Sequence, residues 1–369
     1  MTSRSPPEPP VKGRGATFDP ANRFRADSRE AYDDGWPTDA DDESPPPRKT
    51  TVTIQTSRTI IARNDSPDIP FTQSINPYQG CEHGCIYCYA RPTHACLDLS
   101  PGLDFETRLF AKPDAAKLLR AELAKPGYRC DPIALGTNTD PYQPIERDWK
   151  VTRSILEVLA EHEHPFTVVT KSALVERDID LIAPMAAKRM ARVYLSITTL
   201  DRDLARKMEP RAAAPQRRLQ ALKTLSSSGI PVGVMVAPII PQLNDRDLEA
   251  ILEAAAANGA TSAGWVLVRL PREVAPLFRE WLDVHYPLRA AHVMSLIGQM
   301  RGGRDYDATF GTRMRGTGEL AALLEKRFTI ASRRLGLDRG REQSELDTSR
   351  FRAPAPMRRD DGRQADLFA

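Results

Sequence analysis

Between residues 114 and 300 the sequence alternates between short apolar runs and longer stretches in which apolar residues recur at helical spacing. The apolar runs predict buried strands at Ile133–Thr137, Phe166–Lys171, Arg192–Ile197, Val232–Ala237 and Gly264–Leu270. The helical stretches cover residues 114–125, 150–163, 178–190, 215–227, 245–258, 273–284 and 288–300. Because strands that alternate with helices form parallel βαβ units with right-handed crossovers, the pattern predicts an α/β protein with a parallel sheet.

Two further strands are predicted upstream, at residues 51–56 and 74–80, and the second leads directly into a cysteine-rich loop. About six strand–helix units are enough for a partial or complete barrel, and a doubly wound sheet is the alternative. Parallel barrels carry their chemistry at the C-terminal ends of the strands, so the residues that follow each strand are the first candidates for a site.

The cysteine-rich loop contains Cys81, Cys85 and Cys88 in a C-x3-C-x2-C run, and only Cys96 and Cys130 occur elsewhere. Thiolates this close repel one another and are stabilised by a shared soft metal centre. A structural zinc site or an ordinary four-iron cluster takes four protein ligands, whereas this loop offers three. Three ligands on a four-iron cluster leave one iron open.

Other interpretations of the loop remain open at this point. Cys96 or His94 would make a zinc site if either supplied a fourth ligand, and the three cysteines would otherwise be free thiols. Glu82 and His83 are predicted to be solvated loop residues.

The cysteine run, with the aromatic Tyr87 before its last cysteine, resembles the cluster loop of the radical S-adenosylmethionine (radical SAM) enzymes. The resemblance implies a partial (β/α)6 TIM-like barrel, a [4Fe-4S] cluster on Cys81, Cys85 and Cys88, and S-adenosyl-L-methionine (AdoMet) on the open iron. It also implies a flavodoxin- or ferredoxin-like electron donor. Reductive cleavage of AdoMet would then yield a 5′-deoxyadenosyl radical that abstracts hydrogen from an unknown substrate.

Residues 70–300 resemble more specifically the spore photoproduct lyase branch of that superfamily and its relatives of unassigned substrate. A bound AdoMet needs partners for a carboxylate, a ribose diol and an adenine, and polar residues at the strand ends are suited to these roles. The cofactor contacts implied by the resemblance are Tyr87, Asn138, Lys171, Ser196 and Arg211. Glu209 would join Arg211 at the polar rim, or would pair with it.

One position departs from the lyase pattern. The lyase has a cysteine after its second strand that returns a hydrogen atom to the product radical, and the aligned residue here is Thr137. An alcohol O–H bond is too strong to replace a thiol in that step. Photoproduct repair is therefore not expected unless Cys96 or Cys130 reaches the site.

Composition limits the partners less than the motifs do. The chain has no run of about 18 apolar residues and no secretory signal, which predicts a cytoplasmic protein that does not span a membrane. A net charge of +3 leaves nucleic acid open as a substrate. The alternative function is a zinc or iron–sulfur nucleic-acid-binding module without radical chemistry. The Arg- and Gly-rich residues 301–318 would either clamp a phosphate backbone or form a solvated closing loop.

The two ends of the chain are predicted to be disordered. Residues 1–50 are rich in proline and charge, and residues 336–369 form an Arg-rich tail, so neither can bury enough apolar surface to offset the entropy of ordering. The folded domain is expected to span residues 51–335. Phe18, Phe24 and Trp36 are the residues of the N-terminal segment that would dock on it.

Overall fold

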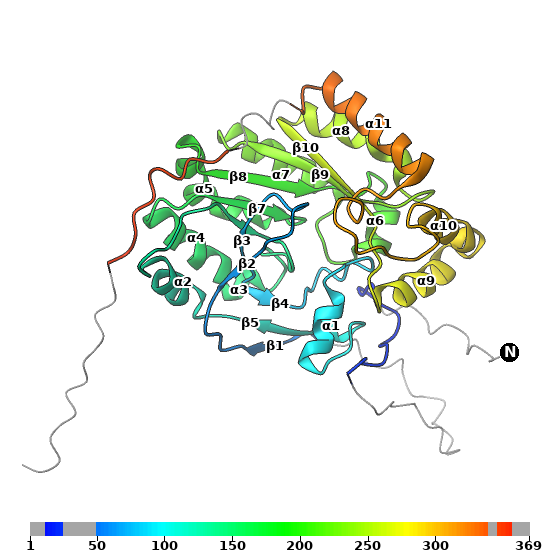
Figure 1. Ribbon diagram of the computed structural model, residues 1–369, viewed down its shortest axis with the longest axis horizontal. Coiled ribbons are helices and arrows are strands. Elements are labelled where there is room, and N and C mark those ends of the chain that lie inside the picture. Colours follow the sequence, from blue (N-terminus) through cyan, green and yellow to red (C-terminus); the bar gives the residue numbers. More distant parts are fainter. Residues whose placement is uncertain (1–11, 25–48, 339–344, 356–369) are drawn as a thin grey trace, which may run out of the picture.

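The computed structural model describes residues 12–24, 49–338 and 345–355 (Figure 1). Its centre is a seven-stranded sheet in the order β10-β9-β8-β7-β6-β3-β2. The strands are β2 (Ile61–Arg63), β3 (Gln73–Ile75), β6 (Ile133–Leu135), β7 (Phe166–Thr170), β8 (Ala191–Ser196), β9 (Val232–Ile239) and β10 (Ser262–Leu267). The six strands from β3 to β10 pair in parallel with their neighbours in chain order, and β2 is an antiparallel edge strand.

This strand order decides between the two predicted architectures. A doubly wound sheet reverses its order at a switch point, whereas here each new strand is added on the same side. The β10 and β2 edges are not paired with each other, so the barrel is open. The predicted α/β fold, a partial parallel (β/α)6 barrel, is confirmed.

Helices cover the outer face of the sheet and close the core (Figure 1). The longer ones are α2 (Ala115–Leu123), α4 (Val151–Glu161), α5 (Ile179–Ala187), α7 (Pro215–Ser227), α8 (Leu248–Ala257), α9 (Val274–His285), α10 (Pro287–Gln299) and α11 (Gly318–Arg334). The short ones are α1 (Asp104–Thr107), α3 (Glu146–Trp149), α6 (Arg202–Met208) and the 3-10 turns η1 (Arg91–Leu97), η2 (Ala173–Asp178) and η3 (Asp245–Asp247). The predicted helices are all present, whereas α11 was not predicted. It packs on α8 and places Phe328 6.2 Å from Trp265 of β10, ring centre to ring centre.

The predicted strand at residues 74–80 is split between two sheets. β3 joins the barrel, while β4 (Tyr78–Gln79) pairs with β5 (Arg108–Ala111) in a small sheet that also contains β1 (Thr51–Ile54). Pro77 separates β3 from β4, and proline has no N–H with which to continue a ladder. The predicted strand at residues 51–56 corresponds to β1 and lies outside the barrel, because β1 pairs with β5 in the small sheet.

Part of the N-terminal segment is packed against the domain, contrary to the predicted disorder. The carboxylate of Asp19 accepts hydrogen bonds from the backbone of Leu103 and Asp104, and Arg23 forms a 2.7 Å ion pair with Glu273. Phe18 packs against the apolar cluster that surrounds α9. Phe24 is exposed, and Trp36 lies outside the described residues.

A piece of the predicted C-terminal tail is also ordered. Residues 345–355 run past α5 and α4 (Figure 1). Phe351 packs on Tyr128 and His164, with ring centres 5.6 and 5.2 Å away. The rest of this tail, residues 339–344 and 356–369, lies outside the described part of the chain.

The loop formed by residues 301–318 uses its own arginines as internal supports. The guanidinium of Arg301 is buried and donates to the carbonyls of Thr312, Arg313 and Val268. Arg313 forms a 2.6 Å ion pair with Asp68. Of the two predicted roles, these contacts favour a closing loop over a phosphate clamp.

Among the described helices, none combines the length and apolar character that a membrane span requires.

Candidate cluster and cofactor site

The cysteine loop is tied to its surroundings through its backbone. The N–H of Cys81 donates to the carbonyl of Phe105 at 2.9 Å, and the N–H of Ile86 donates to that of Met208 at 3.0 Å. Gly84 has φ +66°, and a Cβ built there would lie 2.6 Å from a carboxylate oxygen of Glu106. Only glycine fits this turn without strain.

A buried ion pair holds the loop from behind. Arg91 and Glu106 are both fully buried and lie 2.5 Å apart. Arg91 also donates to the carbonyls of Gly84 and Cys85, while Glu106 accepts from the backbone N–H groups of Gly15 and Ala16 at 2.9 Å. The N-terminal segment is thus part of the support of the loop, because its N–H groups stabilise the carboxylate that pairs with Arg91. Removing one partner of this ion pair would leave a buried charge unpaired.

The five cysteines differ in burial, and Cys130, like Cys88 of the loop, is half-buried. Cys81 and Cys85 are buried and Cys88 is half-buried, whereas Cys96 is exposed on η1. Burial raises the pKa of the Cys81 thiol well above its usual value and that of Cys85 to about 12. Metal binding must therefore displace protons from these thiols. Three soft sulfur donors in one loop suit an iron–sulfur group.

The alternative ligand sets have less support. Within the described residues, no three His, Cys, Asp or Glu side chains are already arranged to hold one metal ion. His94 is engaged elsewhere, since its Nε2 lies 2.9 Å from the carbonyl oxygen of Arg108 and its ring packs edge-on against Phe105. Three cysteines that each bind a different iron of a cluster do not need to converge on one point.

Glu82 and His83 are buried, so the prediction that they are solvated is wrong. Their exposed fractions are 4% and 2%. Glu82 forms a 2.8 Å ion pair with Arg211, and Nδ1 of His83 lies 3.3 Å from a carboxylate oxygen of Asp140. Both partners come from distant parts of the chain, which is why the loop sequence by itself indicated solvent exposure.

Two of the predicted cofactor residues lie together beside the cysteines. Lys171 follows β7, and its Nζ lies 5.8 Å from the centre of the Tyr87 ring. Burial opposes the charge on Lys171, yet the neighbouring Cys85 and Glu209 raise its pKa above the usual value. The structure therefore places a cation next to the cysteine loop, at the C-terminal end of a barrel strand.

Glu209 is at the centre of a buried polar network on the same side. It is paired with Arg218 and accepts hydrogen bonds from the hydroxyls of Tyr87 and Thr198. Burial would raise its pKa, but the charges of Arg218 and Lys171 and these hydrogen bonds bring it down to about 2. The carboxylate is therefore ionised at neutral pH. The proposed pairing of Glu209 with Arg211 is wrong, because Arg218 takes that place.

The remaining predicted cofactor residues are more dispersed. Ser196, at the end of β8, is buried and donates its hydroxyl to the carbonyl of Ala237 at 3.1 Å. Asn138 is held through its backbone N–H, which donates to the Asn76 side chain at 3.0 Å. Arg211 contacts Glu82 and donates its backbone N–H to the carbonyl of His83. Its side chain thus belongs to the support of the cysteine loop.

Sequence reasoning missed two charged residues of the site. Arg218 lies within α7 with no motif around it, so no signal distinguished it from a surface arginine. Asp140 had a weak signal, because it lies in the polar stretch that follows β6. Burial would raise the pKa of its carboxyl group, but the nearby His83 and the hydrogen bonds from the Thr170 hydroxyl and the backbone of Lys171 lower it to about 2.

The fold and the site together define a parallel-barrel protein with a three-cysteine loop at the strand ends. Residues 75–255 match the family model described as Radical SAM superfamily.

Related sequences occur in Mycobacterium and in Methanocaldococcus. An uncharacterized protein of Mycobacterium tuberculosis is 39% identical over 221 residues, which span 59% of this chain and 65% of that protein. An uncharacterized protein of Methanocaldococcus jannaschii is 33% identical over 171 residues, 46% of this chain and 61% of that protein. The aligned region thus spans less than two thirds of each relative.

The solved structures that resemble this one include spore photoproduct lyases. One, complexed with dinucleoside spore photoproduct, has a TM-score of 0.54 at 17% identity and covers 77% of this chain and 78% of that chain. A mutant with bound AdoMet and dinucleoside spore photoproduct has a TM-score of 0.53 at 16% identity, over the same shares. At this level of identity the likeness shows the fold.

Proposed function

We propose that this protein is a radical SAM enzyme in which Cys81, Cys85 and Cys88 hold a [4Fe-4S] cluster and the adjacent barrel mouth binds AdoMet. The observation that carries the proposal is the position of Lys171 and Tyr87 beside Cys85, at the C-terminal edge of a six-stranded parallel sheet. When bound, such a cluster would supply the electron for reductive cleavage of AdoMet, and the resulting radical would remove a hydrogen atom from the substrate.

The residues of the chain provide charge, orientation and exclusion of water. Lys171 is suited to the carboxylate of AdoMet, because a half-buried ammonium forms a stronger charge-assisted bond than an exposed one. Glu209 holds the hydroxyl of Tyr87 and so orients its ring next to Lys171. The buried network of Glu209 and Arg218 holds these groups in place and excludes water from them.

A nucleic-acid lesion is the substrate class that we propose to test first. It rests on the likeness to lyases that hold a dinucleoside photoproduct, and a shared fold is a weak basis for a shared substrate. Neither of the two remaining cysteines compensates for Thr137. Cys130 precedes β6 and Thr137 follows it, so they lie at opposite edges of the sheet, and Cys96 is exposed on η1.

The test is anaerobic reconstitution followed by product analysis. Reconstituted protein should contain about four irons per chain, as a [4Fe-4S] cluster requires, and after reduction with dithionite it should release 5′-deoxyadenosine and methionine from AdoMet. Photoproduct DNA should not be repaired. An intact cluster without 5′-deoxyadenosine would contradict the radical assignment, and bound zinc in place of iron would favour a binding module without radical chemistry.

A further inference from the structure

The described residues nearest the N-terminus, 12–24, lie between α1 and α9 and are dark blue in Figure 1; we call them the strap. The strap crosses the cysteine loop at Gly15, where a Cβ would lie 1.9 Å from the carbonyl oxygen of Gly84. It crosses the turn before α1 at Phe18, whose carbonyl oxygen would lie 2.2 Å from a Cβ on Gly102. At both points backbone packs directly on backbone, because glycine leaves room for this close approach.

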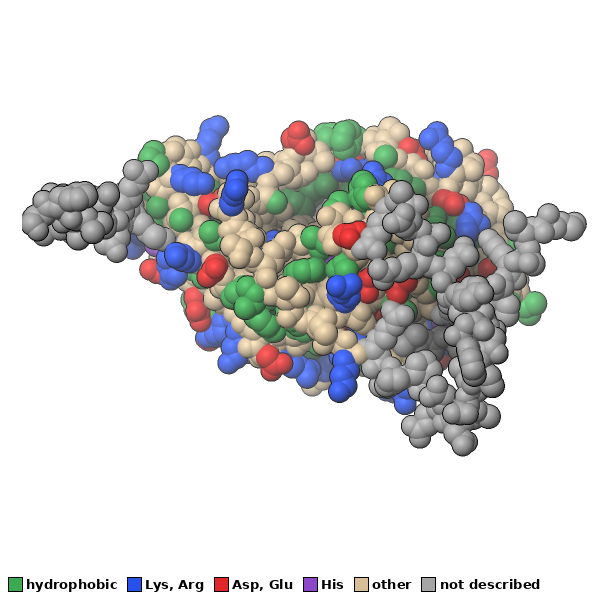
Figure 2. All heavy atoms as spheres, turned by 90° about the horizontal axis from the view of Figure 1, so that it is seen from below, with side chains coloured by type: hydrophobic (Ala, Val, Ile, Leu, Met, Phe, Trp, Pro, Cys, Tyr) green, Lys and Arg blue, Asp and Glu red, His purple; other side chains and the backbone are tan. Residues whose placement is uncertain are grey.

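The strap is held by individual contacts to the elements around the loop. Besides the two N–H groups that donate to Glu106, the hydroxyl of Thr17 donates to Glu280 of α9 at 3.1 Å. Ala16 is buried in the apolar cluster to which Cys85 belongs. On the lower face of the molecule, basic and acidic side chains are interspersed rather than gathered in a patch of one sign (Figure 2). Docking of the strap therefore depends on these specific contacts, and a single substitution can weaken it.

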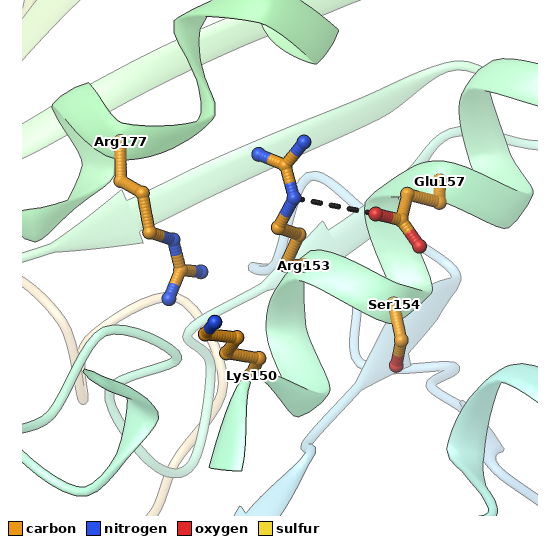
Figure 3. Close-up of a pocket in the computed structure, with 5 residues that line it drawn as sticks. All are labelled: Lys150, Arg153, Ser154, Glu157 and Arg177. Carbon is orange, nitrogen blue, oxygen red and sulfur yellow. Dashed lines mark ion pairs between the residues drawn. The ribbon is translucent and has the colours of Figure 1, made fainter. Parts of the chain in front are cut away.

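Two of the three thiols of the loop are closed to solvent while the strap is docked. The exposed fractions of Cys81 and Cys85 are 7% and 8%. Two hollows on the surface of the described residues lie elsewhere. One, of about 450 Å³, is drawn with its lining residues in Figure 3, and the other, of about 520 Å³, is lined by His83 of the loop but by none of its cysteines. A local opening of the structure is therefore needed before a metal or a thiol reagent reaches these two cysteines.

The strap can leave the loop without disturbing the fold. It contains no strand or helix, since the elements of the described chain begin at Thr51. Release of the strap removes two N–H donors from Glu106, but Arg91 stays in contact with this carboxylate, so that no buried charge is left unpaired. A segment with few apolar anchors opens locally at a lower free energy than the packed elements of a protein.

We propose that the strap is a gate for the cysteine loop: metal reaches the thiols while the strap is undocked, and docking closes the loop around the bound metal centre. The inference rests on the proposed function, because a loop that holds no metal needs no such gate. The closed state is the one in the structure, and the open state is the minor one. A gate of this kind multiplies the rate of every reaction that needs the open state by the same factor. Uptake of metal, loss of metal and alkylation of the thiols should therefore change together.

The experiment compares two substitutions that each add one methyl group to the full-length chain. Gly15→Ala places it against the backbone of Gly84 and should undock the strap. Gly298→Ala in α10 is the matched control, because the nearest atom would lie 3.9 Å from the added Cβ, an ordinary contact. Circular dichroism and thermal unfolding check that both variants fold. Three rates are then measured without oxygen: alkylation of each cysteine by iodoacetamide in the metal-free protein, uptake of iron during reconstitution, and loss of iron to a chelator.

Gly15→Ala should accelerate alkylation of Cys81 and Cys85 by about tenfold or more, because the open state becomes the populated one. Uptake and loss of iron should accelerate by a similar factor, and Gly298→Ala should resemble the wild type in all three rates. Cys96 is exposed and serves as the internal reference, since its alkylation should be equally fast in every variant. A change in the thermal stability of the whole domain would not produce this pattern.

Other outcomes overturn the gate. Slower uptake with faster loss of iron in Gly15→Ala would mean that the strap only shapes the loop, and unchanged alkylation would mean that it does not control access. If Gly15→Ala does not fold, Asp19→Ala takes its place, because it removes the acceptor for the backbone of Leu103 and Asp104 and should accelerate the same three rates. Wild-type protein that takes up no iron would contradict the proposed function instead, while the alkylation rates would still decide whether the strap is a gate.

Discussion

At the two edges of the barrel sheet, titratable side chains that burial affects have opposite charge states: His164 is neutral and Lys171 is charged. At the start of β7, His164 is completely buried and burial lowers its pKa to about 4, so it is neutral. At the end of the same strand, Lys171 stays charged although burial opposes it, because Glu209 and Cys85 are close. Only a few residues separate the two.

The difference shows what permits charge in the interior of this protein. His164 has neutral partners, namely the hydroxyl of Tyr128 at 2.8 Å and the carbonyl of Pro165 at 3.0 Å, and Phe351 covers its ring. The C-terminal edge instead contains opposite charges in contact. Desolvation drives a titratable group to its neutral form unless an opposite charge is near. The C-terminal edge therefore holds charged side chains in the interior, whereas the titratable group at the other edge is neutral.

The largest expected effect is loss of the cluster. Replacing Cys81, Cys85 or Cys88 singly by Ala should abolish the charge-transfer absorbance of the reconstituted protein, because each thiol is one of the three proposed ligands. Cys96→Ala and Cys130→Ala should retain it, since one is exposed and the other lies at the opposite edge. Absorbance lost in Cys96→Ala would indicate a four-ligand site.

The next effect is on stability at the charged edge. Arg218→Met leaves Glu209 ionised and without its partner in the interior, which should lower the free energy of unfolding by about 3 to 5 kcal/mol. Arg334→Met is the matched control, because its ion pair with Glu253 is exposed and should contribute about 0 to 1 kcal/mol. Urea unfolding of both variants measures the difference. Equal losses would show that burial does not determine how much an ion pair contributes to the free energy of unfolding.

A smaller effect is expected on cofactor binding. Lys171→Met should leave the iron content unchanged and weaken AdoMet binding by about 1 to 3 kcal/mol, the range for a lost bond to a charged group. Arg211→Ala should affect AdoMet less, because Arg211 pairs with Glu82. Equilibrium dialysis with labelled AdoMet tests both. If only Arg211→Ala weakened binding, the assignment of the two residues would be reversed.

The smallest effect concerns the neutral edge and pH. The pKa of His164 is lower in the folded state than the usual 6.5, so the unfolded chain binds the proton more readily. Its contribution to stability is therefore complete above pH 6.5 and is lost as the pH falls toward 4. Between pH 7 and 5 this should lower the free energy of unfolding by roughly 1 to 2 kcal/mol. His164→Asn should have a shallower pH dependence over that interval; an unchanged slope would mean that His164 is not the titrating group.

Regular elements with a clear period were predictable from the sequence. Residues 215–227 form a helix as expected, because apolar residues at helical spacing fit only one buried face. The predictions were wrong where local pattern and tertiary contact disagree. α11 has exposed apolar residues as well as buried ones, so its apolar residues do not follow a clear helical period. Its buried face packs on α8. Residues 12–24 lack a periodic pattern, yet Glu106 and Leu103 order them.

The sequence by itself determined the cysteine spacing, the order of strands and helices, and the positions of Lys171 and Ser196 at strand ends, because these depend on neighbours along the chain. Only the tertiary structure decided which charges meet. Arg218 rather than Arg211 neutralises Glu209, and Glu82 and His83 are buried against Arg211 and Asp140. The physical reason is that these ion pairs are short-range contacts between side chains far apart in sequence, and their strength depends on burial. A local sequence pattern does not contain the information on which side chains meet or how deeply they are buried.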